Sequence, residues 1–474
     1  GPAAYGIGFF PAMIAVAGPV LALPVLIGTV ACIFTAISIA VLAMRFAYSG
    51  GVYAYSREAA GVHVGFMVGW AAILAYFFLP AAGALFAGVY GAIFITSISG
   101  ASFVGLDLIV AIIAALAMLF VAYRGISAGA RSMIMMLVVQ ILLVFIVALW
   151  ALSVGLGTPG ANVGAPFDPS FTSWALTESP TAGNWAAIAT AGFTFFFAFY
   201  GFDGTVVFAG EAKSPYRSCA LGAILCILIV GAIYVFWSWA MMLPYTADIT
   251  TFTTMAMDTQ VNLDVSYIAG QAGVAWLGSA SAGIAVFSFA LLLSALGSGT
   301  AAALTISRIL NAMGKDEVMP KSLGKLHPKH ASPYMAAILV GIVTLLFPIG
   351  AFALGIPLVT AFLFTALWCA WGVLIMYFFV NIDNILISRK KLTGKTVLTG
   401  IVVPIVGAIL MAYIWLYSGS AGIYGISEAA ATAGGPWWNT MMLPGFIWMI
   451  IGLVYLIYLH VAKHAVLERG ITAV

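Results

Sequence analysis

The sequence predicts an all-α membrane protein, a bundle of twelve helices that cross a lipid bilayer. Of its 474 residues, 64% are hydrophobic and only 7% are charged, whereas soluble globular proteins carry about 25% charged residues. A chain with so few charges cannot cover the surface of a soluble fold, so lipid must be the solvent for most of it. Long apolar runs and the placement of the basic residues predict the same fold class.

Long apolar runs locate the individual spans, because a helix needs about 20 apolar residues to cross the hydrocarbon core. Eleven runs serve as spans: 19–44, 64–97, 103–123, 132–153, 183–210, 219–243, 272–311, 333–349, 352–380, 397–417 and 440–462. Residues 1–17 form part of a further span, which completes the twelve. Several runs exceed one straight crossing, which indicates tilt or continuation beyond the membrane.

All 17 basic residues fall in alternate connections between these runs. They are Arg45, Arg57, Arg124, Arg131, Lys213, Arg217, Arg308, Lys315, Lys321, Lys325, Lys329, Arg389, Lys390, Lys391, Lys395, Lys463 and Arg469. The other connections have no Lys or Arg and carry only the acids Asp168, Glu178, Asp248, Asp258, Asp264 and Glu428. Because positive loops remain in the cytoplasm, we expect the basic connections and the C-terminus to be cytoplasmic.

The first eight residues contain three glycines and Pro2 and lead directly into the apolar run from Phe9. If that run is the second half of a helix, Gly1 lies at mid-membrane, where a charged amino terminus is costly. We therefore expect the natural protein to have residues before Gly1, so that the first helix is truncated in this chain. A short re-entrant N-terminus is the alternative.

A second interruption lies at 194–204, where Gly201 and Gly204 flank Phe202 and Asp203 within an apolar run. Irregular backbone at membrane depth is tolerated only where it faces protein or a water-filled cavity. Paired breaks of this kind mark the substrate sites of transporters. The two breaks fall in spans one and six, the spacing of a five-plus-five inverted repeat. The alternative is that both glycines serve close helix packing.

Ionisable residues inside apolar runs are functional hypotheses by default. Asp203 follows the second break, and it is either a helix-start residue or part of a site. Glu211 ends the same run and is either functional or the partner of a basic loop residue. Asp107 begins the fourth span, where we expect a solvated or capping role.

Other chemistries find little support in the sequence. Cys32, Cys219, Cys226 and Cys369 have no metal-ligand spacing, and we expect small buried side chains. There is no histidine cluster, nucleotide motif or nucleic-acid-binding patch, so we expect no metal, no cofactor, no nucleic-acid partner and no enzymatic activity. A symmetric pore-loop signature typical of a channel is also absent.

Four ordered segments carry a family resemblance: 45–55 with its Gly50-Gly51-Val52-Tyr53, then 65–70, then 196–203 with Glu211-Ala212-Lys213-Ser214-Pro215, and finally 307–333. Each is weak alone. Together, in this order and at this spacing, they resemble the amino acid–polyamine–organocation transporter family over nearly the whole chain.

The resemblance implies the LeuT-type fold, with a core at 1–380 made of inverted repeats at about 1–153 and 183–380. Two additional C-terminal helices would then lie in 381–474. It implies a secondary transporter of amino acids or related amines that works by alternating access in the cell membrane. A polyamine or organocation carrier or exchanger is an alternative, and a non-transporting membrane subunit or sensor on the same fold is another. The oligomeric state stays open.

The resemblance also implies a central site between helices one, three, six, eight and ten, where backbone groups of the two unwound segments contact the substrate. The residues expected to bind substrate are Ala3, Ala4, Tyr5, Gly6, Gly8, Tyr76, Phe199, Tyr200, Gly201, Phe202, Asp203, Ser294 and Ser298. The rings of Phe199, Tyr200 and Phe202 are candidates for a gate, with ordinary core packing as the alternative.

H⁺ or Na⁺ is a candidate coupling ion, but the residues at both familiar coupling positions depart from the family pattern. Gln140 lies where many proton-coupled members have a lysine, and a glutamine cannot exchange a proton. Leu296 and Gly297 lie where sodium-coupled relatives have paired hydroxyls. The coupling candidates are therefore Asp203, Gln140 and Glu211, and Asp203 is the candidate acid if a proton is carried. Facilitated diffusion or exchange is the alternative.

Overall fold

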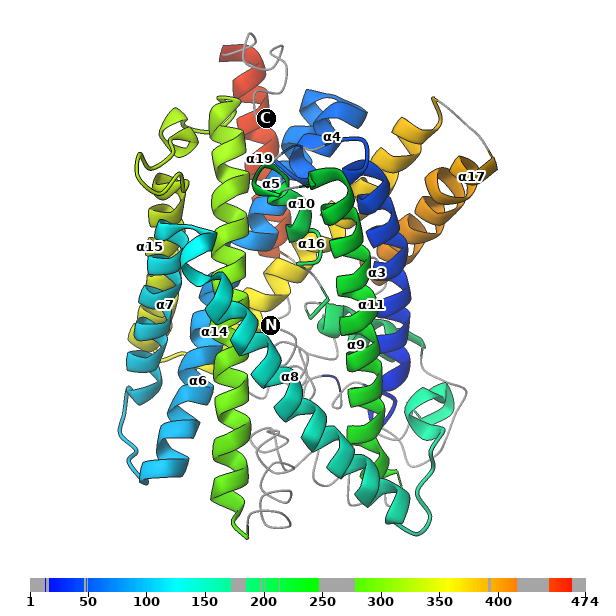
Figure 1. Cartoon of the computed structure of the whole chain (residues 1–474), viewed down its shortest axis with the longest axis vertical. Coiled ribbons are helices and arrows are strands. Elements are labelled where there is room, and N and C mark those ends of the chain that lie inside the picture. The colour runs from blue at the N-terminus through cyan, green and yellow to red at the C-terminus, as the bar shows by residue number, and fades with distance from the viewer. Residues whose placement is uncertain are drawn as a thin grey trace.

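The described residues of this computed structural model are 13, 17–46, 48, 50–171, 185–196, 198–199, 201–212, 214–246, 278–390, 394–415 and 443–462. Every regular element among them is a helix (Figure 1). The expected first interruption lies outside this part, and so do the expected site residues Ala3, Ala4, Tyr5, Gly6, Gly8 and Tyr200.

The helices follow one another in this order: α3 (Ala22–Ala43), α4 (Val52–Ala60), α5 (Val62–Phe77), α6 (Leu79–Ser99), α7 (Leu106–Arg124), α8 (Ile126–Gly157), α9 (Trp185–Phe196), α10 (Gly204–Val207), α11 (Pro215–Met242), α14 (Ala280–Lys315), α15 (Tyr334–Ala353), α16 (Leu358–Ser388), α17 (Gly394–Val397) and α19 (Leu443–Ala462). Short helical turns are η1 (Ala165–Phe167), η3 (Ala209–Glu211), η4 (Leu243–Tyr245), η5 (Lys321–Gly324) and the π-helical η6 (Leu398–Val402).

Within the described residues, ten helices are long and apolar enough to cross a membrane, and each coincides with a run read from the sequence. The eleventh run, 183–210, is not one helix, because α9 and α10 are separated by turns. Several boundaries differ from the predicted runs, and two of the differences have a clear cause. α8 begins at Ile126, directly after Gly125 with φ 87°, and α16 continues to Ser388 because its polar last turns have buried partners instead of water.

Two pairs of helices make the most extensive contacts in the described part of the bundle. α14 packs along α6, and α11 packs along α3. α5 and α6 form one bent crossing, the most buried of the ten, with Pro80 in the first turn of α6, where its missing N–H breaks no helix bond. α8 is the least buried, and its exposed Ile134, Leu142 and Phe145 are suited to lipid.

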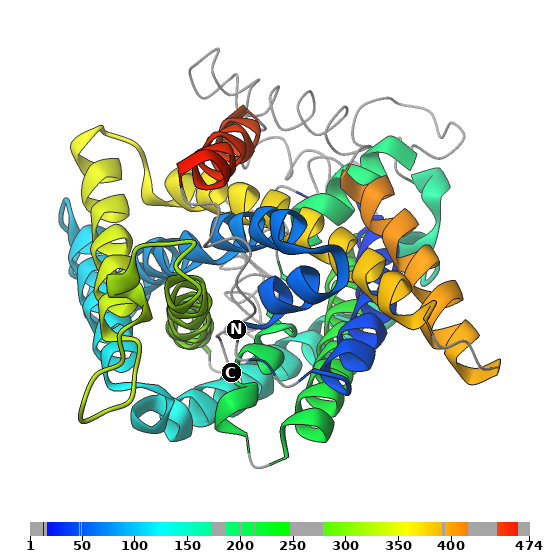
Figure 2. The same ribbon diagram turned by 90° about the horizontal axis from the view of Figure 1, so that it is seen from above.

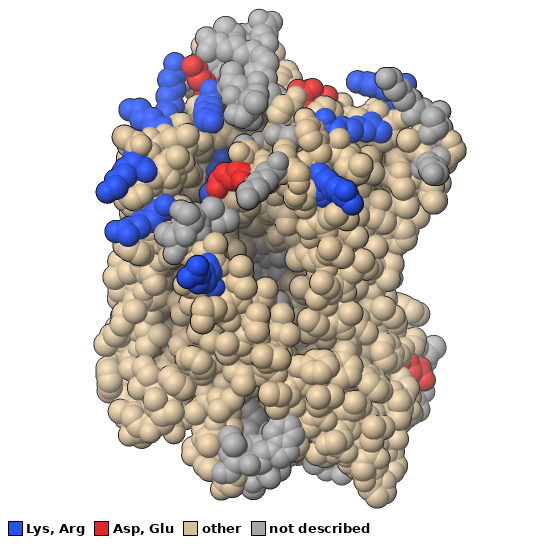
Figure 3. Space-filling view, viewed as in Figure 1, with Lys and Arg blue, Asp and Glu red and all other residues tan. Residues whose placement is uncertain are grey.

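The charges divide the molecule into two ends. In the view of Figure 3 the visible Lys and Arg lie from the top of the molecule down to about mid-height, and none is seen in the lower part. Basic residues lie where helices end or begin at that end: Arg124 ends α7, Lys315 ends α14, Arg389 follows α16 and Arg217 lies in the first turn of α11. We call it the basic end. The alternation of charge along the sequence therefore corresponds to a separation of charge in space.

The C-terminal helix α19 lies at the edge of the bundle (Figure 2) and contacts α5 through paired tryptophans. The Trp70 Nε1 donates to the Trp448 carbonyl at 2.7 Å, and the Trp448 Nε1 donates to the Trp70 carbonyl at 3.0 Å. Their ring centroids lie 4.9 Å apart in a stacked arrangement. Gly452 makes room for this contact, because a Cβ there would lie 2.3 Å from Trp70 Cδ1.

We expect Gly452→Ala to lower the free energy of unfolding by about 1–3 kcal/mol, the usual cost of overpacking. Thermal unfolding of the purified protein in detergent measures the effect. Gly350→Ala on α15 is the matched control, because a Cβ there meets nothing within 4 Å, and it should be neutral or stabilising by up to about 1 kcal/mol. Equal melting temperatures for the two variants would contradict the tryptophan contact.

Candidate functional site

The break between α9 and α10 creates the site. α9 ends at Phe196 and α10 begins at Gly204, with turns between them. The Gly204 N–H donates to the Gly201 carbonyl at 3.0 Å, a three-residue turn in place of a helical bond. Gly201 has φ 109°, a backbone conformation that L side chains rarely adopt. The structure thus confirms the interruption predicted from Gly201 and Gly204.

Asp203 lies in this break and is completely buried. Its Oδ1 accepts hydrogen bonds from the Tyr76 hydroxyl at 2.5 Å, the Tyr377 hydroxyl at 2.6 Å and the Gly201 N–H at 3.3 Å. Its Oδ2 has no hydrogen-bond partner among the described residues. One carboxylate oxygen is therefore fixed by three donors, while the other remains available.

Close contact between α5 and α16 brings the two tyrosines together. A Cβ at Gly372 of α16 would lie 2.8 Å from the Ala75 nitrogen and 2.9 Å from the Ala71 carbonyl oxygen. The two backbones meet there with no side chain between them. Tyr76 and Tyr377 follow at neighbouring positions of the two helices, and both hydroxyls reach the same oxygen of Asp203.

Aromatic rings surround the break. Phe202 lies 5.0 Å from Tyr377 between ring centroids, and Phe199 packs edge-on against Phe195 at 5.3 Å and Tyr234 at 5.4 Å. Phe199 and Phe202 are both buried. These are the contacts of core side chains, so the predicted gating role of the two rings stays a prediction.

Other expected site residues lie apart from this cluster or are used elsewhere. The Ser298 hydroxyl donates to the Ser294 carbonyl at 2.8 Å, within α14 itself. Ser294 is buried on the same helix, and Gln140 is buried on α8, which packs against α14. The structure therefore joins Tyr76, Gly201 and Asp203 directly, and it does not bring the Ser298 hydroxyl to them.

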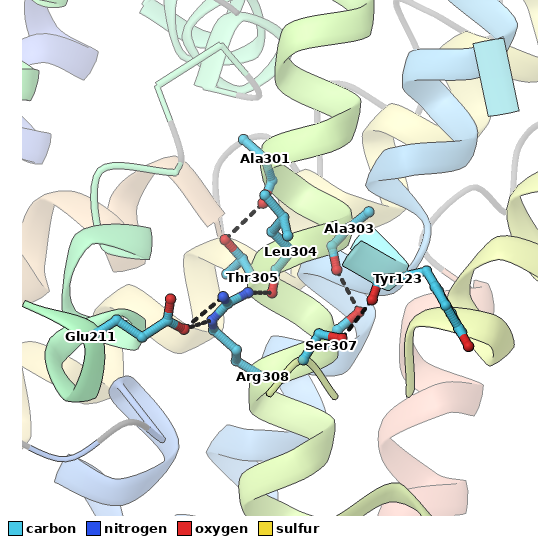
Figure 4. Close-up of polar contacts among 9 residues, drawn as sticks. Tyr123, Glu211, Ala301, Ala303, Leu304, Thr305, Ser307 and Arg308 are labelled. Carbon is cyan, nitrogen blue, oxygen red and sulfur yellow. Dashed lines mark hydrogen bonds and ion pairs between the residues drawn. The ribbon is translucent and has the colours of Figure 1, made fainter. Parts of the chain in front are cut away.

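Glu211 has a structural partner (Figure 4). Its Oε1 accepts from Arg308 Nε at 2.7 Å and lies 2.6 Å from the second terminal nitrogen of the same guanidinium. Arg308 also donates to the Leu304 carbonyl and lies over the ring of Phe208, 4.3 Å from its centroid. The pair ties α14 to the second half of the broken helix. Asp107 lies in the first turn of α7 and accepts from the adjacent Leu108 N–H, but the N-cap of this helix is Gly105 and no side chain caps it.

Sequence reasoning missed Tyr377. The signal was a polar stripe at helical spacing within an apolar span, because Tyr377, Asn381, Asn384 and Ser388 recur every three or four residues. Each of these side chains has a buried partner on another element or on α16.

We expect Tyr76→Phe and Tyr377→Phe each to reduce kcat/KM for transport about threefold to tenfold, because each removes one of three donors to Asp203. The double variant should lose less than the product of the two, since both hydroxyls serve one oxygen. Tyr234→Phe is the control, because its hydroxyl donates to the Ala198 carbonyl instead. A loss in Tyr234→Phe as large as that in the two site variants would contradict the assignment.

A bundle of membrane-crossing helices with one helix broken at a buried carboxylate defines a membrane transporter. Comparison with solved structures shows the fold: MhsT in complex with L-phenylalanine superposes with a TM-score of 0.58 at 13% identity, covering 88% of this chain and 96% of that one. At that identity the likeness concerns the fold alone. The LeuT-type architecture expected from the sequence is confirmed.

The sequence is also similar to curated transporters. It is 29% identical over 439 residues to the low-affinity putrescine importer PlaP of Escherichia coli (strain K12), covering 90% of this chain and 83% of the importer. It is 28% identical over 341 residues to the branched-chain amino acid permease BcaP of Bacillus subtilis (strain 168), covering 68% of this chain and 65% of that protein.

The chain belongs to the amino acid permease family, whose model matches residues 2–417. It is a multi-pass membrane transporter and not an enzyme. The resemblance to the amino acid–polyamine–organocation family is thereby confirmed.

Proposed function

We propose that this chain carries amino acids or related amines by alternating access and that Asp203 binds the ammonium group of the substrate. The supporting observation is the Asp203 carboxylate, which is fully buried in the broken helix, with Oδ2 free of any described partner. Burying a charge without a partner is costly. A substrate ammonium group would supply both the missing donor and the compensating charge.

A polyamine carrier is a second candidate, favoured by the same carboxylate. Asp203 makes no ion pair within the described residues, and its three bonds come from uncharged donors. A site with a carboxylate and no cation of its own suits a polyamine, which has ammonium groups but no carboxylate group to be bound. The similarity to a putrescine importer supports this candidate.

Uptake into proteoliposomes tests both candidates. Purified protein is reconstituted and given radiolabelled putrescine or one of a panel of amino acids. We expect at least one compound with a free amine to accumulate and to be displaced by its unlabelled form but not by its N-acetylated form. Equal displacement by the acetylated compound, or uptake of none of these compounds, would overturn the proposal.

We further propose Asp203 as the acid that couples transport to protons. Gln140 cannot take this role, because a glutamine side chain does not exchange a proton. Asp203 is the acidic residue that lies in the described part of the break. Proton and ammonium would then compete for Oδ2, so that binding of one excludes the other.

For orientation, we infer that the basic end faces the cytoplasm, since positive loops remain inside. In intact cells, with the four native cysteines replaced, a membrane-impermeant thiol reagent should label Asp168→Cys and not Lys325→Cys. Both positions are exposed; Asp168 lies in a connection without basic residues and Lys325 lies in a basic connection. After lysis both should react. Labelling of Lys325→Cys alone in intact cells would show that the basic end faces outward and would contradict this orientation.

A further inference from the structure

The short helix α4 lies between α3 and α5 at the basic end and is held from two sides. On one side, Arg57 donates to Asp316 Oδ2 at 2.7 Å, and the Tyr53 hydroxyl donates to the same oxygen at 2.8 Å. Burial, followed by the charge of Asp316, raises the pKa of Tyr53 above its usual value, so the hydroxyl remains a donor. This carboxylate has its cation beside it.

On the other side, the Ser56 hydroxyl of α4 donates to Asp383 Oδ2 of α16. Asp383 is completely buried, and its Oδ1 has no hydrogen-bond partner in the described part of the chain. No described Lys, Arg or His forms an ion pair with it. Thus two buried carboxyls hold the same short helix, and only one of them is paired with a cation.

The charged groups around Asp383 are used elsewhere. Arg57 of α4 pairs with Asp316, and Glu58 beside it is exposed. Arg45, after α3, donates to Ser388 at 3.2 Å. His63 of α5 contacts His460 of α19, and Asp203 in the broken helix accepts from Tyr377, which precedes Asp383 on α16.

The polar neighbours of Asp383 on α16 are also committed. Asn381 donates to Thr35 of α3 and accepts from Ser38, while Asn384 donates to the Thr399 carbonyl. They hold α16 against α3 and η6 and leave Ser56 as the donor that the structure gives to Asp383.

We propose that Asp383 is a proton-binding site that controls the contact between α4 and α16. An ionised carboxyl buried with a single hydroxyl donor is strongly disfavoured. With α4 in place, Asp383 therefore holds its proton. When α4 separates from α16, water reaches the carboxyl, the O–H bond breaks and the proton leaves to water. The closed state holds one more proton than the open state, so rising pH favours opening.

The position of α4 connects this proton-binding site to two membrane-crossing helices. α4 directly joins the crossing helices α3 and α5, and the latter carries Tyr76 of the site. Opening of α4 would loosen the basic end of the carrier near the broken helix. That consequence rests on the proposed alternating access, whereas the proton site itself does not.

Hydrogen–deuterium exchange of the 52–60 segment tests the proposal without any transport assay. The full chain in lipid nanodiscs is measured from pH 5.5 to 8.5, with intrinsic exchange rates corrected for pH. In wild type, the protection of this segment should fall by up to about tenfold per pH unit over part of the range, as expected for release of one proton. In Asp383→Asn the protection should be independent of pH. A flat profile in wild type, or an unchanged slope in Asp383→Asn, would overturn the proposal.

Two further variants separate this site from its neighbours. Ser56→Ala removes the donor but keeps the acid, so the fall in protection should extend to higher pH; an unchanged profile would contradict the assignment, even if Asp383→Asn failed to fold. Asp203→Asn removes the other buried acid and should keep the wild-type profile at α4. If it abolishes the profile, the proton belongs to Asp203. Loss of uptake in Asp203→Asn with an intact profile would affect only the proposed transport role.

Discussion

Replacing Asp203 by asparagine should reduce kcat/KM for uptake about 30-fold or more. Asparagine keeps an acceptor for Tyr76, Tyr377 and the Gly201 N–H, so the fold of the break is preserved. It loses the negative charge that a substrate ammonium group would pair with, and truncating one partner of such a pair costs about 2–5 kcal/mol. Uptake by proteoliposomes with matched protein content measures the loss.

The same variant decides the coupling role when uptake is measured with and without an imposed pH gradient. If Asp203 carries the proton, wild type should respond to the gradient and any residual uptake by Asp203→Asn should not. An equal response in both proteins would remove Asp203 as the coupling acid. A wild type that ignores the gradient would instead favour exchange.

Gly201→Ala should abolish most uptake, by at least about tenfold, although a Cβ there would meet no atom within 4 Å. The cause is the backbone, because φ 109° strains any L residue by about 1–3 kcal/mol. Relief of that strain would rotate the turn whose N–H bonds Asp203, and the carboxylate would leave its place between the tyrosines.

Gly204→Ala is the matched control for this prediction. It lies at the other edge of the same break, its φ lies outside the left-handed region, and its Cβ would meet only the Thr305 hydroxyl oxygen at 3.3 Å. Uptake and melting temperature should stay closer to wild type in Gly204→Ala than in Gly201→Ala. The reverse order would show that packing, and not backbone conformation, explains the glycines.

The fold was largely predictable because the bilayer imposes a length on every apolar run. The run 103–123 corresponds to α7 at Leu106–Arg124, and 219–243 corresponds to α11 at Pro215–Met242. Prediction failed where polar residues remain helical and buried. The run 352–380 was ended at the polar residues that follow, yet α16 continues to Ser388. Asp383 lies beyond the predicted end of this run and was therefore not among the predicted intramembrane acids.

Only those features of the site that depend on residues close together in the sequence could be predicted. Glycines around an acid in an apolar run indicate a break, and Gly201, Phe202 and Asp203 lie there. The partners of that acid depend on how distant helices approach. Tyr377 lies 174 positions away, and only the contact at Gly372 brings it to Asp203. Glu211 illustrates the same limit, since its partner Arg308 comes from α14 and not from a nearby loop.

The most direct measurement is a structure of the protein with the transported substrate bound. We expect ligand density in the break between α9 and α10, with a ligand nitrogen about 3 Å from Asp203 Oδ2 while Tyr76 and Tyr377 keep their bonds to Oδ1. A ligand seated elsewhere, or one in this break whose nitrogen points away from Asp203, would contradict the assignment of Asp203 as the ammonium partner.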